Sequence, residues 1–331
     1  MTKVFVTGAS GFIAKHIVSE LLDKGYAVRA GIRSQRRKIE LQNLFPDAGL
    51  EFALLDLMQD DGWHQAMQGC DILMHTASPL PLAEPKDPQE LIRPAVDGTM
   101  RALRAAKAAG ITRVILTSSN VAMYKDPAKP IDQPSDESNW TDPEDPTVVA
   151  YEASKTLAER AAWDFVANNP EMELTTINPG MVFGPPLDAH FSTSLEIVER
   201  LMSGKDPLAP PMQMPIVDVR DVAMLHVAAI DHEAATGERY AATAGTLRFI
   251  DLCQALKAWD PSLKIARKEA PVWLLRLIGL FVPEARSITK NVGRNLSVSG
   301  SKAETAFNFK FIPAEEALLS AAQAIRAAKA H

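Results

Sequence analysis

The stretch Lys3–Ala14, which reads KVFVTGASGFIA, decides the fold. Its first part, Lys3–Thr7, is a short apolar and β-branched run of the kind that forms a buried strand. In Phe12–Lys24 the apolar residues recur at helical spacing. The two parts are joined by a loop in which small residues follow the pattern G-x-x-G-x-x-A. We therefore expect a strand, a tight turn and a helix at the beginning of the chain.

A loop of this kind suits a pyrophosphate. Its glycines let the backbone turn tightly and approach the phosphates, whose charge meets the N-terminus of the following helix. Ala14, in the third place, still permits close packing of helix on strand. Glycines also occur in ordinary turns, but this context favours a dinucleotide site. The candidate residues are Gly8, Gly11, Phe12 and Ile13.

The composition excludes several classes of protein. The 331 residues are enough for about two domains, and 47% of them are hydrophobic. The net charge of −6 argues against a nucleic-acid partner. The two cysteines, Cys70 and Cys253, are too few for a disulfide scaffold or a thiolate metal site and suit a reducing compartment. The apolar run 272–282 is interrupted by Arg276 and falls short of the ~20 residues that span a bilayer. We expect a cytoplasmic protein with no membrane partner and no metal.

Strand and helix patterns alternate through the first half of the chain, which predicts an α/β fold. We expect a Rossmann-type, doubly wound parallel sheet in residues 1–178 that binds the dinucleotide. After Pro179, repeated prolines break the regular pattern. Residues 179–331 are expected to form mainly a smaller C-terminal lobe for the substrate. The chain is expected to return to the first domain around 216–240, with the sheet itself rejoined near 216–222.

The end of the second predicted strand, 26–32, indicates which dinucleotide binds. NAD-binding units usually place an acid there for the ribose 2′-hydroxyl, but this chain has no acid before Glu40. Arg33 is placed to meet a 2′-phosphate, and Arg37 could join it from the next helix. The alternative is a basic run that only faces water. The missing acid favours NADP(H).

Two patterns carry the candidate chemistry. Tyr151 and Lys155 are four residues apart, so they share one face of a predicted helix at 150–168. An ammonium beside a phenol favours the phenolate, so Lys155 is expected to lower the pKa of Tyr151. Ser119 follows the fifth predicted strand, where a hydroxyl can contact a substrate carbonyl. Alone, each could be an exposed helix pair or a capping serine, but the combination with the glycine loop is specific.

With these motifs in view, the chain resembles an extended short-chain dehydrogenase/reductase. It is most similar to the dihydroflavonol reductase-like group of NADPH-dependent aldehyde and ketone reductases. The resemblance covers nearly the whole chain, and further segments that carry it are 56–57, 69–71, 75–79, 116–119, 178–185 and 217–223.

The resemblance implies roles for individual residues. Ser119 would steady the carbonyl oxygen, Tyr151 would protonate it, and Lys155 would tune Tyr151 and hold the nicotinamide ribose, while NADPH delivers a hydride. The implied cofactor contacts are Tyr151 and Lys155 themselves, Asp56 and Leu57 at the adenine, Thr76, Ala77 and Ser78 beside the cofactor, and Pro179 and Val182 at the nicotinamide.

Other readings remain open. The same scaffold serves NAD-dependent sugar-nucleotide epimerases and hydroxysteroid-type dehydrogenases, and a non-catalytic dinucleotide-binding redox sensor belongs to another class. His75 and His226 are expected to be structural. Five residues either line an apolar pocket or pack the lobe: Met123, Phe183, Phe191, Met212 and Met214. The sequence leaves open the small-molecule substrate, the preferred direction of reaction, and whether the protein is a monomer or a homodimer.

Overall fold

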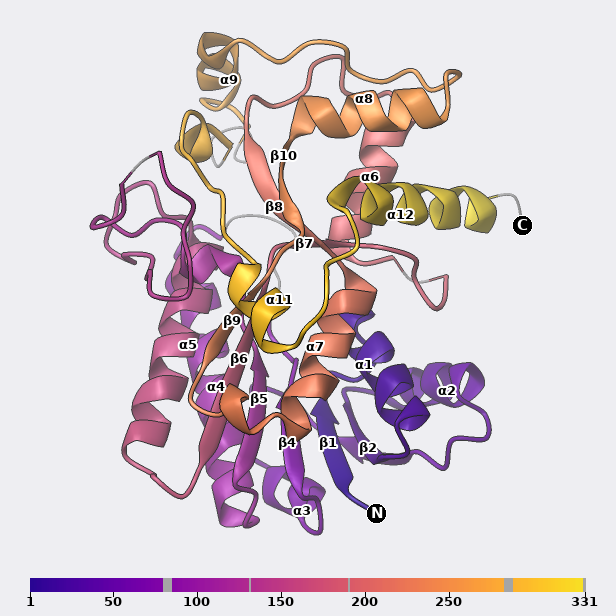
Figure 1. The fold of residues 1–331 in the computed structure, drawn as a ribbon, viewed down its shortest axis with the longest axis vertical. Helices are drawn as coiled ribbons and strands as arrows, with labels where there is room; N and C mark the ends of the chain where they lie inside the picture. Colours follow the sequence, from indigo (N-terminus) through magenta and orange to yellow (C-terminus); the bar gives the residue numbers. More distant parts are fainter. Residues whose placement is uncertain (80–84, 131, 190, 283–287, 330–331) are drawn as a thin grey trace.

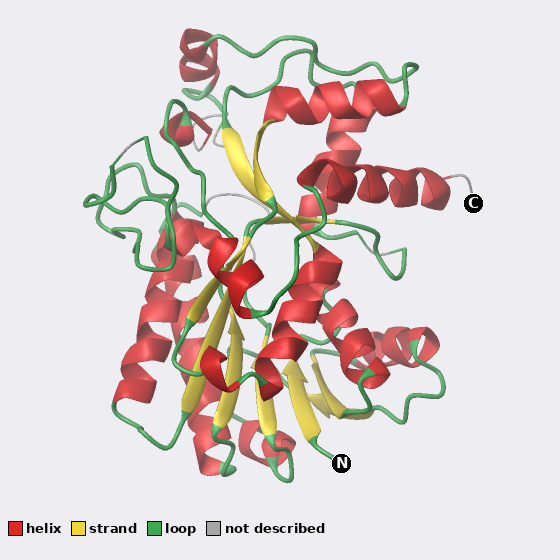
Figure 2. Cartoon of the chain, viewed as in Figure 1, coloured by secondary structure: helices red, strands yellow, loops and turns green. Residues whose placement is uncertain are grey.

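The computed structural model describes residues 1–79, 85–130, 132–189, 191–282 and 288–329. A parallel sheet with helices on both of its faces forms the larger lobe, drawn in the lower half of Figures 1 and 2. The strand order is β3-β2-β1-β4-β5-β6-β9. The strands are β1 (Lys3–Thr7), β2 (Ala27–Ile32), β3 (Glu51–Leu54), β4 (Ile72–His75), β5 (Arg113–Thr117), β6 (Glu173–Pro179) and β9 (Arg239–Ala242). This confirms the predicted doubly wound α/β fold.

Two apolar layers hold the helices to the sheet. Buried side chains of α1 (Phe12–Asp23), α2 (Gln35–Leu44) and α7 (Val219–Asp231) form one core cluster with one face. Those of α3 (Trp63–Met67), α4 (Gln89–Ala108) and α5 (Ala150–Ala167) form a cluster with the other. Burial on both faces explains why strands such as β1 read as continuous apolar runs.

The strand order reverses between β1 and β4. The chain first winds outward through β2 and β3, then returns to β4 beside β1 and winds the other way. At such a switch point the loops beyond the carboxyl ends of the strands diverge and leave a crevice for a ligand. The glycine loop after β1 and Thr76–Ser78 after β4 therefore lie side by side.

The smaller lobe, in the upper half of Figure 1, is built around a second sheet of three strands. Its order is β10 (Gly245–Arg248), β8 (Gln213–Asp218) and β7 (Met181–Phe183). Its core cluster includes α6 (Thr193–Ser203), α8 (Phe249–Trp259) and α12 (Ala314–Lys329). Further short elements are α9 (Val272–Ile278), α11 (Ser301–Ala306), η1 (Asn120–Ala122) and η2 (Glu233–Ala235).

The expected return to the main sheet at 216–222 is wrong. Residues 216–218 pair within the small sheet, and α7 begins at Val219. The strand that rejoins the main sheet is β9, parallel to β6.

None of the described helices is both long and apolar enough to cross a bilayer.

A buried ion pair anchors β9. Arg239 Nε lies 2.7 Å from Glu159 Oε1, and the two side chains are 8% and 0% exposed. The guanidinium also stacks on the Trp140 ring, with its carbon 3.6 Å from the ring centroid. Its Nη1 donates to the carbonyls of Glu137 and Asn139 at 2.7 and 2.9 Å. One side chain thus ties the last strand of the sheet to α5 and to the long loop before it.

Arg239→Met is expected to lower the melting temperature by several degrees, because it leaves Glu159 buried without its cation, a loss of about 3–5 kcal/mol. The matched control is Arg200→Met, which removes an ion pair with Asp206 in which the arginine side chain is 68% exposed. Exposed pairs contribute about 0–1 kcal/mol, so the control should melt close to the wild type. Equal melting temperatures for the two variants, measured by differential scanning calorimetry, would contradict this account.

Candidate active site

The glycine loop adopts a conformation that requires glycine. Gly8 has φ +61°, and a Cβ added there would lie 3.0 Å from the Cα of Ala77. The loop is also bonded to the neighbouring strand, since the Ala9 N–H donates to the Gly31 carbonyl at 3.1 Å. Gly11 is the N-cap of α1 and provides no side-chain cap, so amide groups of the first turn lack that partner.

This loop fits the pyrophosphate of a dinucleotide. The uncapped start of the twelve-residue helix α1 presents N–H groups and the positive end of the helix dipole. Gly8, Gly11, Phe12 and Ile13 all line one cavity of about 390 Å³.

The end of β4 is clamped to the end of β1. The hydroxyl oxygen of Thr7 accepts the backbone N–H groups of Thr76 and Ala77 at 3.0 and 3.1 Å. It also bonds to Nδ1 of His75 at 2.8 Å. Burial, and then the charge of Lys155, lower the pKa of His75 to about 3, so this histidine stays neutral. Thr76 and Ser78 line the cavity, and Ala77 packs against Gly8.

Ser119, Tyr151 and Lys155 meet in the same cavity. Ser119 follows β5, and its hydroxyl accepts the Val121 N–H at 3.3 Å and donates to the Pro179 carbonyl at 3.4 Å. A side-chain hydrogen bond joins Ser119 to Tyr151. Tyr151 and Lys155 lie one turn apart near the start of α5. The structure thus brings the three predicted side chains together.

The pKa values in this group correct one prediction. Burial raises the pKa of Tyr151, and the hydrogen bond with Ser119 opposes this. The prediction of a lowered pKa for Tyr151 is therefore wrong for this structure, because burial of the phenol raises it. Burial also lowers the pKa of Lys155 to about 8, an effect that the charge of Glu159 opposes. At neutral pH the phenol is protonated and most of the lysine is charged.

Glu159, one turn beyond Lys155, is a site residue that the sequence argument missed. Its side chain is fully buried. Donors on β6, on β9 and beside Ser119 converge on it: Thr176 at 3.1 Å, Asn178 at 2.7 Å, Arg239 at 2.7 Å, and the hydroxyl of Ser118. The signal that could have found it is an acid four residues after the lysine, on the same helical face.

The rest of the cavity wall is mainly apolar. Its apolar side chains include Met181, Met212, Met214, Ile197 and Leu296, and they are joined by Tyr124, Gln213 and Asn291. Pro179, the last residue of β6, and Val182, in β7, also line it. Lys155 is the one charged side chain among the described residues of the lining. Of the five proposed pocket residues, Met212 and Met214 contribute to the wall, whereas Met123 and Phe183 are fully buried in core clusters and Phe191 packs against the lobe core.

The residues proposed for the adenine end do not line this cavity. Arg33 lies just beyond β2, is exposed, and has no ion-pair partner among the described residues. Arg37 is already paired with Glu40, whose carboxylate lies 2.7 Å from its Nη1. Asp56 Oδ1 accepts the Met58 N–H at 2.9 Å. Leu57 packs under α4, where a Cβ on Gly98 would lie 3.0 Å from it.

His226 is held as a structural residue. Its Nε2 bonds to the Thr117 hydroxyl and its Nδ1 to the Val222 carbonyl, both at 2.7 Å. Within the described part of the chain, no three His, Cys, Asp or Glu side chains come together as a metal site would need.

Known proteins resemble this chain over most of its length. The tetraketide alpha-pyrone reductase 1 of Arabidopsis thaliana is 36% identical over 277 residues, which cover 80% of this chain and 83% of the relative. The ketoreductase azaE of Aspergillus niger is 37% identical over 285 residues, covering 79% and 83%. Among solved structures, the yeast methylglyoxal/isovaleraldehyde reductase complexed with NADPH is 30% identical, covers 99% of both chains and superposes with a TM-score of 0.83.

A family model reaches the same result independently of any single relative. The model of the NAD dependent epimerase/dehydratase family matches residues 4–242, from β1 to the end of β9. The chain therefore belongs to this family, the extended short-chain dehydrogenases/reductases, as the resemblance implied.

Proposed function

We propose that this protein is an NADP(H)-dependent reductase that converts an aldehyde or ketone to an alcohol, reversibly. The observation that carries the proposal is one cavity whose lining includes both the glycine loop and the group Ser119, Tyr151 and Lys155. The three relatives described above are all named as reductases, which favours this reading over an epimerase or a redox sensor. Residues 1–178 would mainly hold the cofactor and residues 179–331 the substrate.

Each residue of the group has a chemical task in this proposal. Ser119 donates a hydrogen bond to the carbonyl oxygen and so holds it beside Tyr151. Tyr151, whose pKa is raised by burial, is protonated at neutral pH and gives its proton to the oxygen as negative charge develops there. Lys155 stabilises the resulting phenolate and binds the nicotinamide ribose. NADPH, when bound, supplies the hydride.

The polarity of the cavity lining also indicates which chemical class of substrate fits. Because its described part is mainly apolar and its single charge belongs to Lys155, a neutral and largely apolar carbonyl compound fits best. A carboxylate on the substrate would be desolvated in this wall without a dedicated cation.

At the other end of the cofactor, we propose that Arg33 binds the 2′-phosphate. The hydrogen bond from Ala9 to Gly31 places the end of β2 beside the glycine loop, and Arg33 follows directly. A guanidinium matches a phosphate dianion. Arg37 would have to give up its ion pair with Glu40 to bind the phosphate, so we propose that it contributes less to phosphate binding than Arg33. Asp56 and Leu57 are proposed to line the adenine.

The protein is further proposed to act in the cytoplasm, as a monomer or a homodimer. Both cysteines, Cys70 and Cys253, are buried and unpaired, as a reducing compartment permits.

Tyr151→Phe should lower kcat for NADPH-dependent reduction of uncharged aromatic aldehydes by about 10²–10⁴-fold, because the proton donor is lost. The Kd for NADPH, measured by quenching of protein fluorescence, should change less than about threefold, since the phenol oxygen acts on the substrate. Turnover close to that of the wild type would refute the assignment of Tyr151.

Arg33→Ala should raise KM for NADPH at least about tenfold and leave KM for NADH nearly unchanged, because only NADPH carries the 2′-phosphate. Arg36→Ala is the matched control, since Arg36 lies in the same basic run, 77% exposed, and pairs with Glu40. The measurement is steady-state kinetics with both cofactors. If KM for NADPH and KM for NADH rise by the same factor in Arg33→Ala, Arg33 does not bind the 2′-phosphate.

A further inference from the structure

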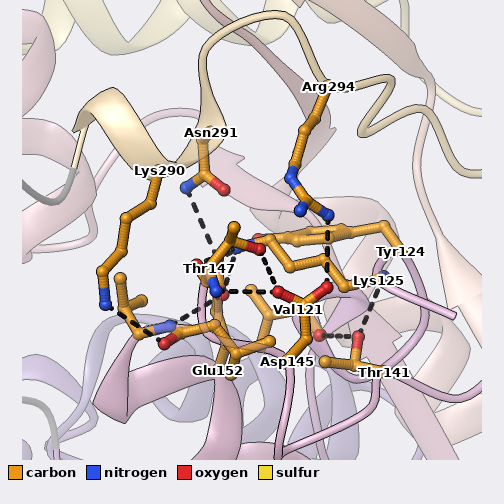
Figure 3. Close-up of polar contacts among 12 residues, drawn as sticks. Val121, Tyr124, Lys125, Thr141, Asp145, Thr147, Glu152, Lys290, Asn291 and Arg294 are labelled. Carbon is orange, nitrogen blue, oxygen red and sulfur yellow. Dashed lines mark hydrogen bonds and ion pairs between the residues drawn. The ribbon is translucent and has the colours of Figure 1, made fainter. Parts of the chain in front are cut away.

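A buried carboxylate holds the start of α5 to two other segments of the chain (Figure 3). Glu152 directly follows the candidate proton donor, and its side chain is 3% exposed. Its Oε2 accepts Lys125 Nζ at 2.6 Å and the backbone N–H of Val149 at 3.0 Å. Its Oε1 accepts the hydroxyl of Tyr124 and Nδ2 of Asn291, each at 3.4 Å. Glu152 therefore joins the segment after β5 and the segment 288–296 to the start of α5.

The contact with Glu152 orients the amide of Asn291. A carboxylate oxygen accepts hydrogen bonds, so the Nδ2 side of the amide faces Glu152 and the oxygen lies on the other side (Figure 3). That oxygen, Oδ1, is buried and has no hydrogen-bond partner among the described residues. Asn291 also lines the cavity that holds Ser119 and Tyr151. A buried acceptor without a partner costs free energy, which a donor on a ligand would recover.

Lys125 keeps the carboxylate in this arrangement. Its side chain is fully buried, and Nζ donates to the Thr147 carbonyl at 2.8 Å as well as to Glu152. Burial lowers the pKa of Lys125, and the charge of Glu152 opposes this. A buried pair is costly to desolvate and often adds little stability over apolar residues. Its clearest effect here is geometric, because Lys125 occupies Oε2 and Oε1 remains for Tyr124 and Asn291.

We propose that Asn291 determines specificity: its Oδ1 accepts a hydrogen bond from a hydroxyl or N–H group of the substrate. Glu152 and Lys125 are positioning residues that hold the amide in place. The inference rests on the proposed reductase function and narrows its substrates to neutral carbonyl compounds that also carry a hydrogen-bond donor. An amide oxygen accepts but does not donate, so a substrate with only an acceptor at that place gains nothing.

Paired substrates test this directly. The ortho, meta and para (hydroxymethyl)benzaldehydes are compared with the ethylbenzaldehydes of the same substitution, which replace the hydroxyl by a methyl group. For at least one position, the wild type should show a kcat/KM about ten- to hundredfold higher for the hydroxymethyl compound. Asn291→Leu, which keeps the branching and the number of side-chain heavy atoms but has no acceptor, should remove that preference.

Further variants separate positioning from packing. Lys125→Met should also weaken the preference, because Glu152 loses the cation that fixes it. Arg294→Met, on the same segment as Asn291, removes an ion pair with Asp145 in which the two side chains are 35% and 26% exposed, and it should keep the wild-type ratio. Leu296→Val alters the same wall without a polar atom and should change kcat/KM for both members of a pair by one factor.

Two results would overturn the proposal. In the first, the ratio of kcat/KM between the hydroxymethyl and the ethyl compound is the same in the wild type and in Asn291→Leu at all three positions. This result contradicts the role of Asn291 but not the reductase function, because the aldehydes are still reduced. A wild-type enzyme that reduces none of the six aldehydes with NADPH contradicts both this inference and the reductase function on which it rests.

Discussion

Hydrogen bonds from strands β6 and β9 and from the segment after β5 converge on the carboxylate of Glu159. These are the elements that carry the candidate site, because Ser119 follows β5, Pro179 ends β6 and Lys155 lies one turn before Glu159 on α5. A buried carboxylate is tolerated only when it is paired and fully hydrogen-bonded, so the strands and the helix can adopt few other arrangements. The same charge acts on Lys155 and opposes the fall of its pKa on burial.

A second buried carboxylate, Glu152, repeats this construction on the substrate side of α5. Glu159 orders the strand ends beneath Ser119 and Lys155, whereas Glu152 orders the wall beside Tyr151. On this helix the candidate proton donor Tyr151 is next to one buried carboxylate, Glu152, and Lys155 lies one turn before the other, Glu159. Each carboxylate has its own cation, Lys125 for Glu152 and Arg239 for Glu159. We interpret this as preorganisation: the groups that meet the substrate are held by residues that do not touch it.

Local patterns were sufficient to predict the parts of the site that lie close together in the sequence. The glycine loop and the pair Tyr151 and Lys155 depend on turn chemistry and helical spacing alone, and the strand-end position of Ser119 follows from the alternating pattern. The contacts that support them are distant in sequence: Arg239 is 80 residues from Glu159, and Asn291 is 139 residues from Glu152. A periodic pattern indicates local structure and cannot predict contacts between residues so far apart in the sequence. The pKa of Tyr151 was predicted in the wrong direction for a related reason, since spacing gives proximity to Lys155 but not the burial of the phenol.

The most direct test of this account is the pH dependence of kcat/KM for NADPH, a ratio that reports the ionisation of the free enzyme. Lys155, with a pKa of about 8, is charged below that value, so the wild-type ratio should fall as the pH rises through about 8. In Glu159→Gln the negative charge that favours the ammonium form of Lys155 is gone, so the pKa of Lys155 should be lower and kcat/KM should fall at a lower pH. Calorimetry at each pH checks that the variant is folded. A fall at the same pH in both enzymes would contradict the claim that Glu159 sustains the charge of Lys155.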